Sequence, residues 1–310
     1  MGTSLAKYAI GYGSTIAGAI LLLSMLSLSC GNAEDVSVTA SPKEAVVSET
    51  ASSEIRKESG FSYEIYDAVL QAYVDDQGLV DYRSLHANRS DLDAFNASMA
   101  RLSPKEFEAW PEQERLAFWI NAYNAITLER IIDHYPIKKG GVIAGFRYPH
   151  NSIRQIPGVW KKLTNTVMGE EITLDSIEHD MLRAKFKEPR IHVALVCAAL
   201  SCPPLRNEAF VAGRLDEQLD DQSRRFLSND TRFRIDRAKK RVYLSAILDW
   251  FGKDFAGIYN TGGKIAAHSK TEGAALEYVS RYVSDEDVQF ILSENYSVTF
   301  LDYDWTLNER

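Results

Sequence analysis

The stretch RIHVALVCAALSCPPL, residues 190–205, organises the rest of the chain. It follows a proline, alternates β-branched with small apolar residues and ends at two prolines, which is the pattern of a buried strand that runs into a tight loop. The stretch contains one histidine, His192, and two cysteines, Cys197 and Cys202. Thiols and imidazoles are the side chains of nucleophilic catalysis, so we expect any chemistry of this protein to take place here.

The composition is that of a globular protein. The chain has 310 residues, of which 45% are apolar and 25% are charged, and this is enough material for one large hydrophobic core. The formal net charge is -8, and the basic residues form no Lys/Arg-rich block. Because phosphate binding requires a clustered basic face, these features argue against a nucleic acid as a partner.

Residues 1–30 have the features of an export signal. Lys7 supplies a thin positive region, residues 16–28 are apolar, and Cys30 ends the segment. The pattern resembles a bacterial lipoprotein signal, in which the cysteine is lipid-modified and becomes the first mature residue, although Ser27 stands where leucine is usual. We therefore predict a lipoprotein of the bacterial cell envelope, anchored to a membrane through Cys30 and facing the periplasm or the outside. A plain secretory signal and an uncleaved anchor are the alternatives.

Two further segments follow the signal. Residues 31–59 are rich in Ser, Glu, Ala, Thr and Val without any helical or strand period, which predicts a flexible tether. Helical spacing of apolar residues begins near Phe61, so the globular domain is expected over residues 60–310.

The segment 116–132 predicts the central helix of that domain, because it is apolar on nearly every side. Two amides interrupt it, Asn121 and Asn124, which share one face. A buried amide without a partner costs about 1–3 kcal/mol, so we expect these two to tie a loop to the helix. They are also candidate ligand-binding residues, together with Trp119 and Arg183.

Short hairpins and further helices accompany this helix. The expected hairpins and terminal strand cover residues 165–173, 233–244 and 297–303. The main remaining helices are expected over residues 174–183, 215–227 and 272–282. Helices interspersed with short hairpins predict an α+β fold, a single mostly helical domain with short antiparallel strands and hairpins around the buried central helix.

Five short motifs occur in order along the chain. They are FWINAYNA at 118–125, IEH at 177–179 with Arg183, RIHVALVC at 190–197, SCPPL at 201–205 and YDWTLN at 303–308. Together these motifs resemble the family called domain of unknown function 547, over residues 61–308. The resemblance implies that the amide-bearing helix, the Glu-His pair, and the histidine and cysteines of the 190–205 stretch recur in the family. It implies no activity.

The same residues are compatible with a cysteine-dependent hydrolase or acyl transferase. In such enzymes a thiolate attacks, a histidine lowers its pKa, and a polar side chain orients the histidine. The candidate catalytic residues are Cys202, Cys197, His192, His179 and Glu178. On an ideal strand His192 and Cys197 point to opposite faces, which favours Cys202, beyond the turn, as the reactive thiol.

We expect these groups to meet in one cavity. It should contain His192, His179 and at least one of the two thiols, and its wall should be the helix face that carries Asn121 and Asn124. The ligand is expected to be a small molecule or peptide-like.

Two other hypotheses use the cysteines differently. Cys197 and Cys202 could form a bridge in an oxidising compartment, structural or in a thiol-redox protein, although their spacing is not Cys-x-x-Cys. A zinc site with His179 and His192 lacks the usual paired short spacings, so we expect no metal and no cofactor.

A binding or scaffold lipoprotein without catalysis is the third hypothesis, because buried cysteines usually behave as small hydrophobes. Asp175, His179 and Arg183, spaced four apart, are then an ion network on one helix face. Three aromatic residues are expected in the core: Trp250, Phe251 and Phe255.

Overall fold

The centre of the first hydrophobic core is helix α6 (Glu112–Asp133). The structure, a computed structural model, describes residues 61–259, 265, 268–293 and 295–310. Every residue from Leu116 to Leu128 is buried, as expected for a helix that is apolar on nearly every side. The prediction of a buried central helix is therefore confirmed.

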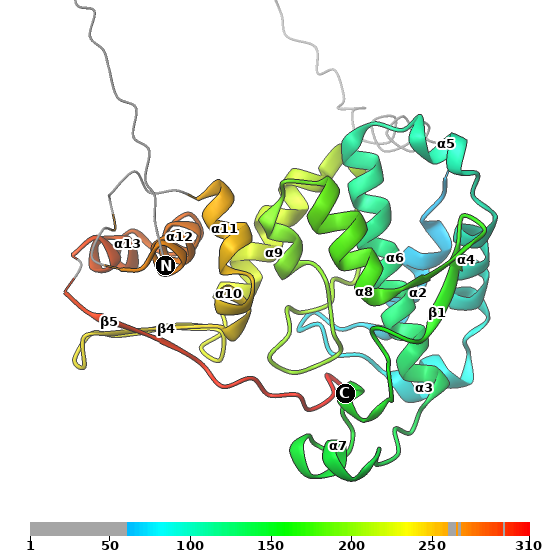
Figure 1. The fold of residues 1–310 in the computed structure, drawn as a ribbon, viewed down its shortest axis with the longest axis horizontal. Helices are drawn as coiled ribbons and strands as arrows, with labels where there is room; N and C mark the ends of the chain where they lie inside the picture. The colour runs from blue at the N-terminus through cyan, green and yellow to red at the C-terminus, as the bar shows by residue number, and fades with distance from the viewer. Residues whose placement is uncertain (1–60, 260–264, 266–267, 294) are drawn as a thin grey trace, which may run out of the picture. The chain divides into compact units, whose positions relative to one another are not determined.

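Helices and a hairpin surround α6 (Figure 1). Helices α3 (Tyr82–Ala87) and α4 (Ser90–Arg101) pack against it. The elements that complete this region are α2 (Glu64–Tyr73), α5 (Pro104–Glu108), α7 (Val142–Arg147), β1 (Thr164–Val167), β2 (Glu170–Thr173), α8 (Leu174–Ser176) and the π-helix η3 (Ile177–Arg183). Strands β1 and β2 form the expected antiparallel hairpin, with a left-handed residue, Gly169, in its turn.

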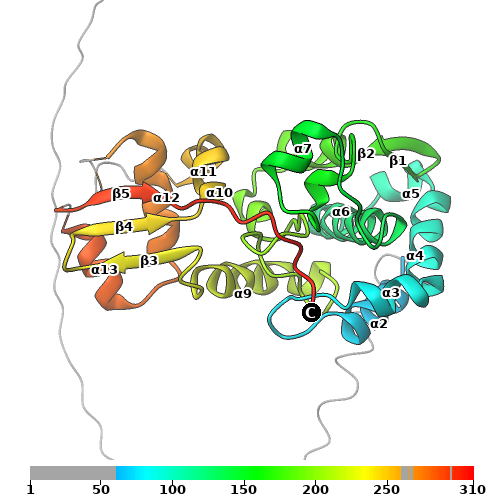
Figure 2. The same cartoon turned by 90° about the horizontal axis from the view of Figure 1, so that it is seen from below.

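A second hydrophobic core is built on a three-stranded sheet of order β3-β4-β5 (Figure 2). The strands are β3 (Phe233–Asp236), β4 (Arg241–Leu244) and β5 (Ser297–Phe300), and the helices of this region are α10 (Ala246–Trp250), α11 (Gly252–Ile258), α12 (Lys270–Ser280) and α13 (Asp285–Leu292). Helix α9 (Leu215–Leu227) contributes Leu219 to the first core and Phe226 to the second.

The α+β prediction is confirmed, with one difference in the sheet. Strands β3 and β4 pair antiparallel, whereas β4 and β5 pair parallel, with Val242 opposite Val298. The chain passes through α10 to α13 between these two strands, and a crossover of this length returns a strand in the same direction.

The prediction of a strand at the start of the 190–205 stretch is wrong. Residues Pro189–Val193 form a short 3-10 helix, η4, and the chain then continues as an irregular loop. The segment is buried, as the apolar pattern indicated. Its backbone polar groups, however, form hydrogen bonds with a side chain and not with a neighbouring strand. The side chain of Asn124 accepts a hydrogen bond from Val196 N–H and donates one to Ala194 C=O. A short apolar run does not distinguish these two solutions.

The predicted signal peptide and tether, residues 1–59, lie outside the described residues. Within the ranges that the structure describes, no helix is both long and apolar enough to cross a membrane.

Candidate functional site

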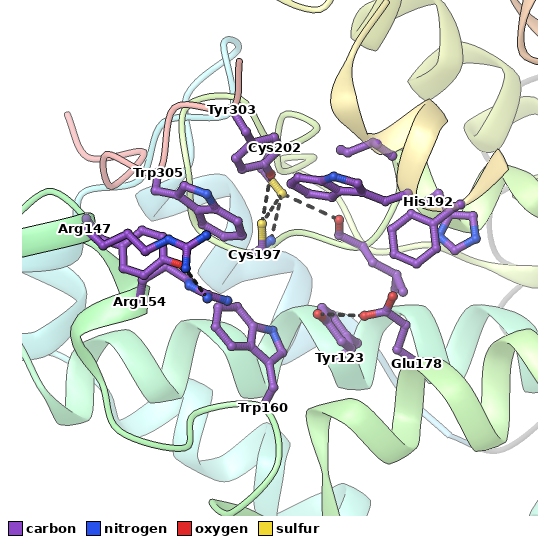
Figure 3. Close-up of a pocket in the computed structure, with 15 residues that line it drawn as sticks. Tyr123, Arg147, Arg154, Trp160, Glu178, His192, Cys197, Cys202, Tyr303 and Trp305 are labelled. Atoms are coloured by element: carbon purple, nitrogen blue, oxygen red, sulfur yellow. Dashed lines mark hydrogen bonds between the residues drawn. The ribbon is translucent and has the colours of Figure 1, made fainter. Parts of the chain in front are cut away.

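A cavity of about 610 Å³ opens beside the loop that carries the two cysteines (Figure 3). Its size is within the range of small-molecule sites. Its lining combines thiols, a histidine, a carboxyl group, two arginines and several aromatic rings: Tyr123, Arg147, Tyr148, Arg154, Trp160, Glu178, His192, Leu195, Cys197, Cys202, Ile247, Trp250, Phe251, Tyr303 and Trp305.

The backbone turns sharply between the cysteines. Ala198 has a φ of 54°, in the left-handed region that non-glycine residues rarely adopt, at a cost of about 1–3 kcal/mol. Cys202 N–H donates to the carbonyl of Ala199 at 3.0 Å, which closes the turn and brings the second cysteine back to the first. A buried backbone in this conformation requires support from the surrounding structure.

The C-terminal segment supplies part of that support. It runs from β5 in the second core back to the first core, where Leu307 is buried (Figure 2). Leu200 N–H donates to the carbonyl of Thr306 at 2.8 Å, and Asp304 N–H donates to Ser201 Oγ at 2.9 Å. The last of the five sequence motifs therefore holds the cysteine loop.

The two amides of α6 supply the rest. Asn124 binds the backbone of residues 194 and 196, immediately before the first cysteine. Asn121 binds Phe210 in the same manner, with its Nδ2 donating to the carbonyl at 2.8 Å and its Oδ1 accepting from the N–H at 2.9 Å. The prediction that the amides are buried and tie a loop to the helix is confirmed. Because the bound segments cover this helix face, neither amide lines the cavity.

The two thiols contact each other. The sulfur atoms of Cys197 and Cys202 are 3.0 Å apart, and both cysteines are free. The backbone N–H of Cys197 donates to the sulfur of Cys202 at 2.8 Å. The hydroxyl of Tyr303 is 3.1 Å from the sulfur of Cys197. Each donor has one acceptor when Tyr303 O–H donates to Cys197 Sγ and Cys197 S–H donates to a thiolate on Cys202.

These contacts separate the acidities of the two thiols. Burial raises the pKa of Cys202, but the S–H and backbone N–H of Cys197, the Tyr303 hydroxyl and the charge of Arg232 outweigh it, so the pKa lies below that of an ordinary cysteine. The hydrogen bond to Cys202, together with burial, raises the pKa of Cys197 well above the ordinary value. Of the two thiols, Cys202 therefore loses its proton first, and Cys197 is the one that stays protonated.

His192 belongs to a separate hydrogen-bonded group. Its Nε2 is 2.8 Å from Asp254, which also receives two hydrogen bonds from Arg183 at 2.6 and 2.9 Å. The ring stacks on Phe251 with centroids 3.8 Å apart. Burial lowers the pKa of His192 more than Asp254 raises it, so the imidazole is neutral near pH 7 and donates from Nε2. The hydrogen bond from His192 holds the pKa of Asp254 well below its usual range.

No imidazole in the described part of the chain hydrogen-bonds to either thiol. In Figure 3 the cysteines lie in the middle of the cavity and His192 lies at one end. The argument that Cys197 points away from the site depended on an ideal strand, and it fails because both cysteines line the cavity. The structure thus brings His192 and the two thiols into one cavity without joining them as a hydrogen-bonded pair.

Glu178 and His179 are neighbours in sequence but have different surroundings. Glu178 lines the cavity, and its Oε2 accepts a hydrogen bond from Tyr123 at 3.3 Å. Burial raises the pKa of Glu178 above that of an ordinary glutamate. His179 lies outside the lining, 3.6 Å from Asp175 and 2.9 Å from Arg183. The predicted ion network on this helix face is confirmed, and the expectation that His179 shares the cavity is wrong.

The remaining predicted residues also lie away from the lining. Trp119 is buried in the first core, where its ring packs against Phe107 and Phe118. Arg183 is bound to Asp254 and does not line the cavity. Both residues pack or pair with protein groups, which explains why they do not reach the cavity.

The aromatic and cationic part of the lining was not predicted. Trp250, expected in the core, is 50% exposed and lies against Tyr303 and Trp305 at the cavity. Arg147 and Arg154 come from the segment between Asp133 and Glu170, which contains six Lys or Arg residues and no Asp or Glu. That absence of acidic residues was a signal in the sequence for a positively charged wall.

The described side chains also bear on metals. No group of three or more His, Cys, Asp or Glu side chains within the described ranges is arranged to hold a metal ion.

The part of the chain that contains this site is similar to a protein family. Neither the curated proteins nor the solved structures gave a match. Residues 107–227 match a family model described as protein of unknown function, DUF547. The matched segment contains helix α6, the π-helix and the entire cysteine loop. The match supports a DUF547 domain in this chain, and residues 107–227 of that domain carry both thiols and His192 of the cavity.

Proposed function

We propose that the protein is a thiol–disulfide exchange protein that acts on a small disulfide or dithiol bound in the cavity. The observation that carries this proposal is the pair of sulfur atoms 3.0 Å apart on the cavity wall. Thiol–disulfide exchange requires one thiolate to attack and a second thiol within reach to complete the reaction. The two cysteines meet both requirements without a histidine.

The chemistry follows from the assignment of the thiolate. Cys202 S⁻ attacks one sulfur of a substrate disulfide, the S–S bond breaks, and one substrate half leaves as a thiolate. The S–H proton of Cys197 passes to that leaving thiolate, and Cys197 then attacks the Cys202 sulfur and displaces the second half. The substrate is reduced by two electrons to two thiols, one of them protonated by water, and the dithiol is oxidised to a Cys197–Cys202 disulfide.

Glu178 fits the role of proton carrier in this scheme. Its raised pKa keeps a larger fraction of the carboxyl group protonated than in an ordinary glutamate, and it lines the same cavity as the thiols. A protonated carboxyl group close to a leaving thiolate supplies the proton that otherwise comes from water.

A test uses full-length protein with Cys30→Ser, in which the cavity cysteines are the only thiols. Dithiodipyridine, a chromogenic disulfide, should release two equivalents of pyridinethione per chain, and mass spectrometry should find an internal Cys197–Cys202 disulfide. The matched variant Cys197→Ser should release one equivalent and retain a mixed disulfide on Cys202. Release of a single equivalent by the parent protein, with a stable mixed disulfide, contradicts the proposal.

A second candidate is the cysteine-dependent hydrolase or acyl transferase. His192 favours it, because this residue lines the cavity and hydrogen-bonds to Asp254, and a carboxylate partner orients the base in many acyl-transfer enzymes. Incubation with a nitrophenyl ester distinguishes the two candidates. The hydrolase is supported if Cys202 forms an acyl adduct, the adduct is hydrolysed and the ester is turned over repeatedly. This turnover should be lost in His192→Gln.

The cell-envelope location remains a proposal that the sequence of residues 1–30 supports. If Cys30 is the lipid anchor, mass spectrometry of the mature protein should find a diacylated cysteine at the N-terminus. An unmodified N-terminus beyond residue 30 would exclude the lipoprotein form. Export would also place the dithiol in an oxidising compartment, where thiol–disulfide exchange has substrates.

A further inference from the structure

We propose that Arg154 and the aromatic rings around it form an anion subsite, so that the disulfides taken by this cavity are small and carry a carboxylate. This proposal rests on the proposed exchange function for the identity of the reacting bond, but the subsite itself depends only on the geometry of the arginine wall.

The guanidinium of Arg154 is enclosed by aromatic rings. It lies 4.5 Å from the ring centroid of Tyr148, 5.0 Å from that of Trp305 and 5.3 Å from that of Trp160. Its Nη2 also donates to the hydroxyl of Tyr148 at 2.6 Å. These contacts hold the planar cation in one orientation, and a pre-oriented guanidinium loses less entropy when it binds a carboxylate.

Arg154 has no carboxylate partner among the described residues, in contrast to Arg183, Arg190 and Arg206. Arg183 pairs with Asp254, Arg190 with three carboxylates and Arg206 with two. Shielding a cation from solvent costs free energy that an ion pair offsets, and aromatic faces offset only part of that cost. The free donor edge of Arg154 therefore suits an anionic ligand.

The subsite and the thiols belong to one cavity. Figure 3 shows Arg147, Arg154, Trp160 and Trp305 at one end and the cysteines in the middle. The exposed Arg147 adds a second cation to the same wall. The carboxyl group of the cavity, Glu178, lies at the opposite end with Tyr123.

An aromatic path connects the two groups. The ring of Trp305 is 4.5 Å from that of Tyr303, whose hydroxyl contacts the sulfur of Cys197. A ligand whose carboxylate binds Arg154 can therefore lie across Trp305 with its disulfide at the cysteines.

The test compares two chromogenic disulfides that differ in charge. Dithiobis(nitrobenzoate) is an aromatic disulfide with two carboxylates, and dithiodipyridine is an uncharged one. In the Cys30→Ser protein, Arg154→Gln should lower the second-order rate constant for the anionic reagent about 10-fold or more, because a charge-assisted hydrogen bond is lost. The rate constant for the neutral reagent should change about 2-fold or less. The exposed Arg101→Gln should leave both rate constants unchanged.

Two outcomes overturn the subsite. One is an equal loss with both reagents, which would mean that Arg154 only supports the structure, and the other is no change with either. Arg154→Lys retains the charge and should recover part of the anionic rate, which keeps the test valid if the glutamine variant does not fold.

A non-reacting ligand separates this proposal from the exchange function. Nitrobenzoate carries the carboxylate without a disulfide, and nitrobenzamide is its neutral counterpart. Calorimetry should show saturable binding of nitrobenzoate alone, lost in Arg154→Gln. If the thiols prove inert to both disulfides while nitrobenzoate still binds, the exchange function fails and the anion subsite stands. If nitrobenzoate does not bind to the parent protein, the subsite fails.

Discussion

The short helix η4 contributes residues to two cavities. In one cavity an arginine is paired with carboxylates, and in the other an arginine has no carboxylate partner among the described residues. Arg190 of this helix lines a cavity of about 400 Å³, where its guanidinium binds Glu188, Asp216 and Asp220 at 2.6–2.7 Å. His192, two residues later, lines the thiol cavity, which also contains the uncompensated Arg154.

The difference separates a structural from a functional use of the same residue type. An arginine whose three nitrogen atoms all bind the protein's own carboxylates, as in Arg190, holds together the elements that carry them, here η4 and α9, and its charge is already compensated. An arginine held by aromatic faces and one hydroxyl group, as Arg154 is, keeps its other donors available. The volumes of the two cavities do not reveal this difference. It lies in whether the arginine of each cavity is paired with a carboxylate of the protein.

The largest expected effect is on stability, and it tests this contrast directly. Arg190→Gln leaves three carboxylates close together without their shared cation, so we expect a loss of about 2–4 kcal/mol, since the pairs are only partly shielded from solvent. Arg154→Gln removes no ion pair of the described residues and should cost about 1 kcal/mol or less. Urea denaturation measures both. Similar losses for the two variants would break the comparison.

The two amides of α6 allow the contrast to be sharpened near the thiols. Asn121→Ala and Asn124→Ala each leave one buried N–H and one buried C=O without a partner, so each should lose about 2–3 kcal/mol of stability. Only Asn124 holds the backbone beside Cys197. The rate of thiol reaction with dithiodipyridine should therefore change in Asn124→Ala and stay constant in Asn121→Ala.

The pH dependence of stability gives a smaller effect. The pKa of His192 is lowered in the folded protein, so below about pH 6.5 the unfolded chain binds a proton that the folded chain does not. The stability difference between the parent protein and His192→Gln should therefore shrink as the pH falls from 7.5 to 5. If the difference grows instead, His192 is charged in the folded state and Asp254 outweighs burial.

The smallest expected effect is a shift in the pH profile of alkylation. The lowered pKa of Cys202 should keep its reaction with iodoacetamide going at pH values where an ordinary thiol, with a pKa of about 8.5, reacts little. Cys197, whose pKa is raised, should remain unmodified there. Peptide mass spectrometry resolves the two sites, and a profile of ordinary shape at Cys202 would remove the preformed thiolate from the scheme.

The local sequence pattern was sufficient to predict a helix or strand where one type of residue dominates the whole element. The apolar run of 116–132 had no polar face to present to water, so it could only be a buried helix, and the two amides inside it had to find backbone partners. The hairpin at 165–173 followed from glycine in its turn. The clustering of His192 and the two thiols was visible because these residues are close in sequence.

The rest depended on contacts between segments that are far apart in the chain. The buried run before Cys197 was read as a strand, but a side-chain amide from α6 took the place of a neighbouring strand, and no local pattern reports which partner a backbone group finds. Trp250 was assigned to the core for its size, although it lines a cavity beside residues more than fifty positions later. The nearness of His179 in sequence predicted that it joins the thiols, whereas its ring contacts Asp175 and Arg183 and lies outside the cavity lining.

By itself, the sequence determined that residues 116–132 form a buried helix, that the chain is an α+β protein, and that its thiols and His192 lie close together. Those properties follow from hydrophobic periodicity and from short separations along the chain. Only the tertiary structure decided that the sulfur atoms contact each other, that His192 pairs with Asp254 instead of a thiol, and that Arg154 faces the same cavity. The reason is that pKa and reactivity depend on burial and on hydrogen-bond partners, and here those partners come from segments that only the folded chain brings together.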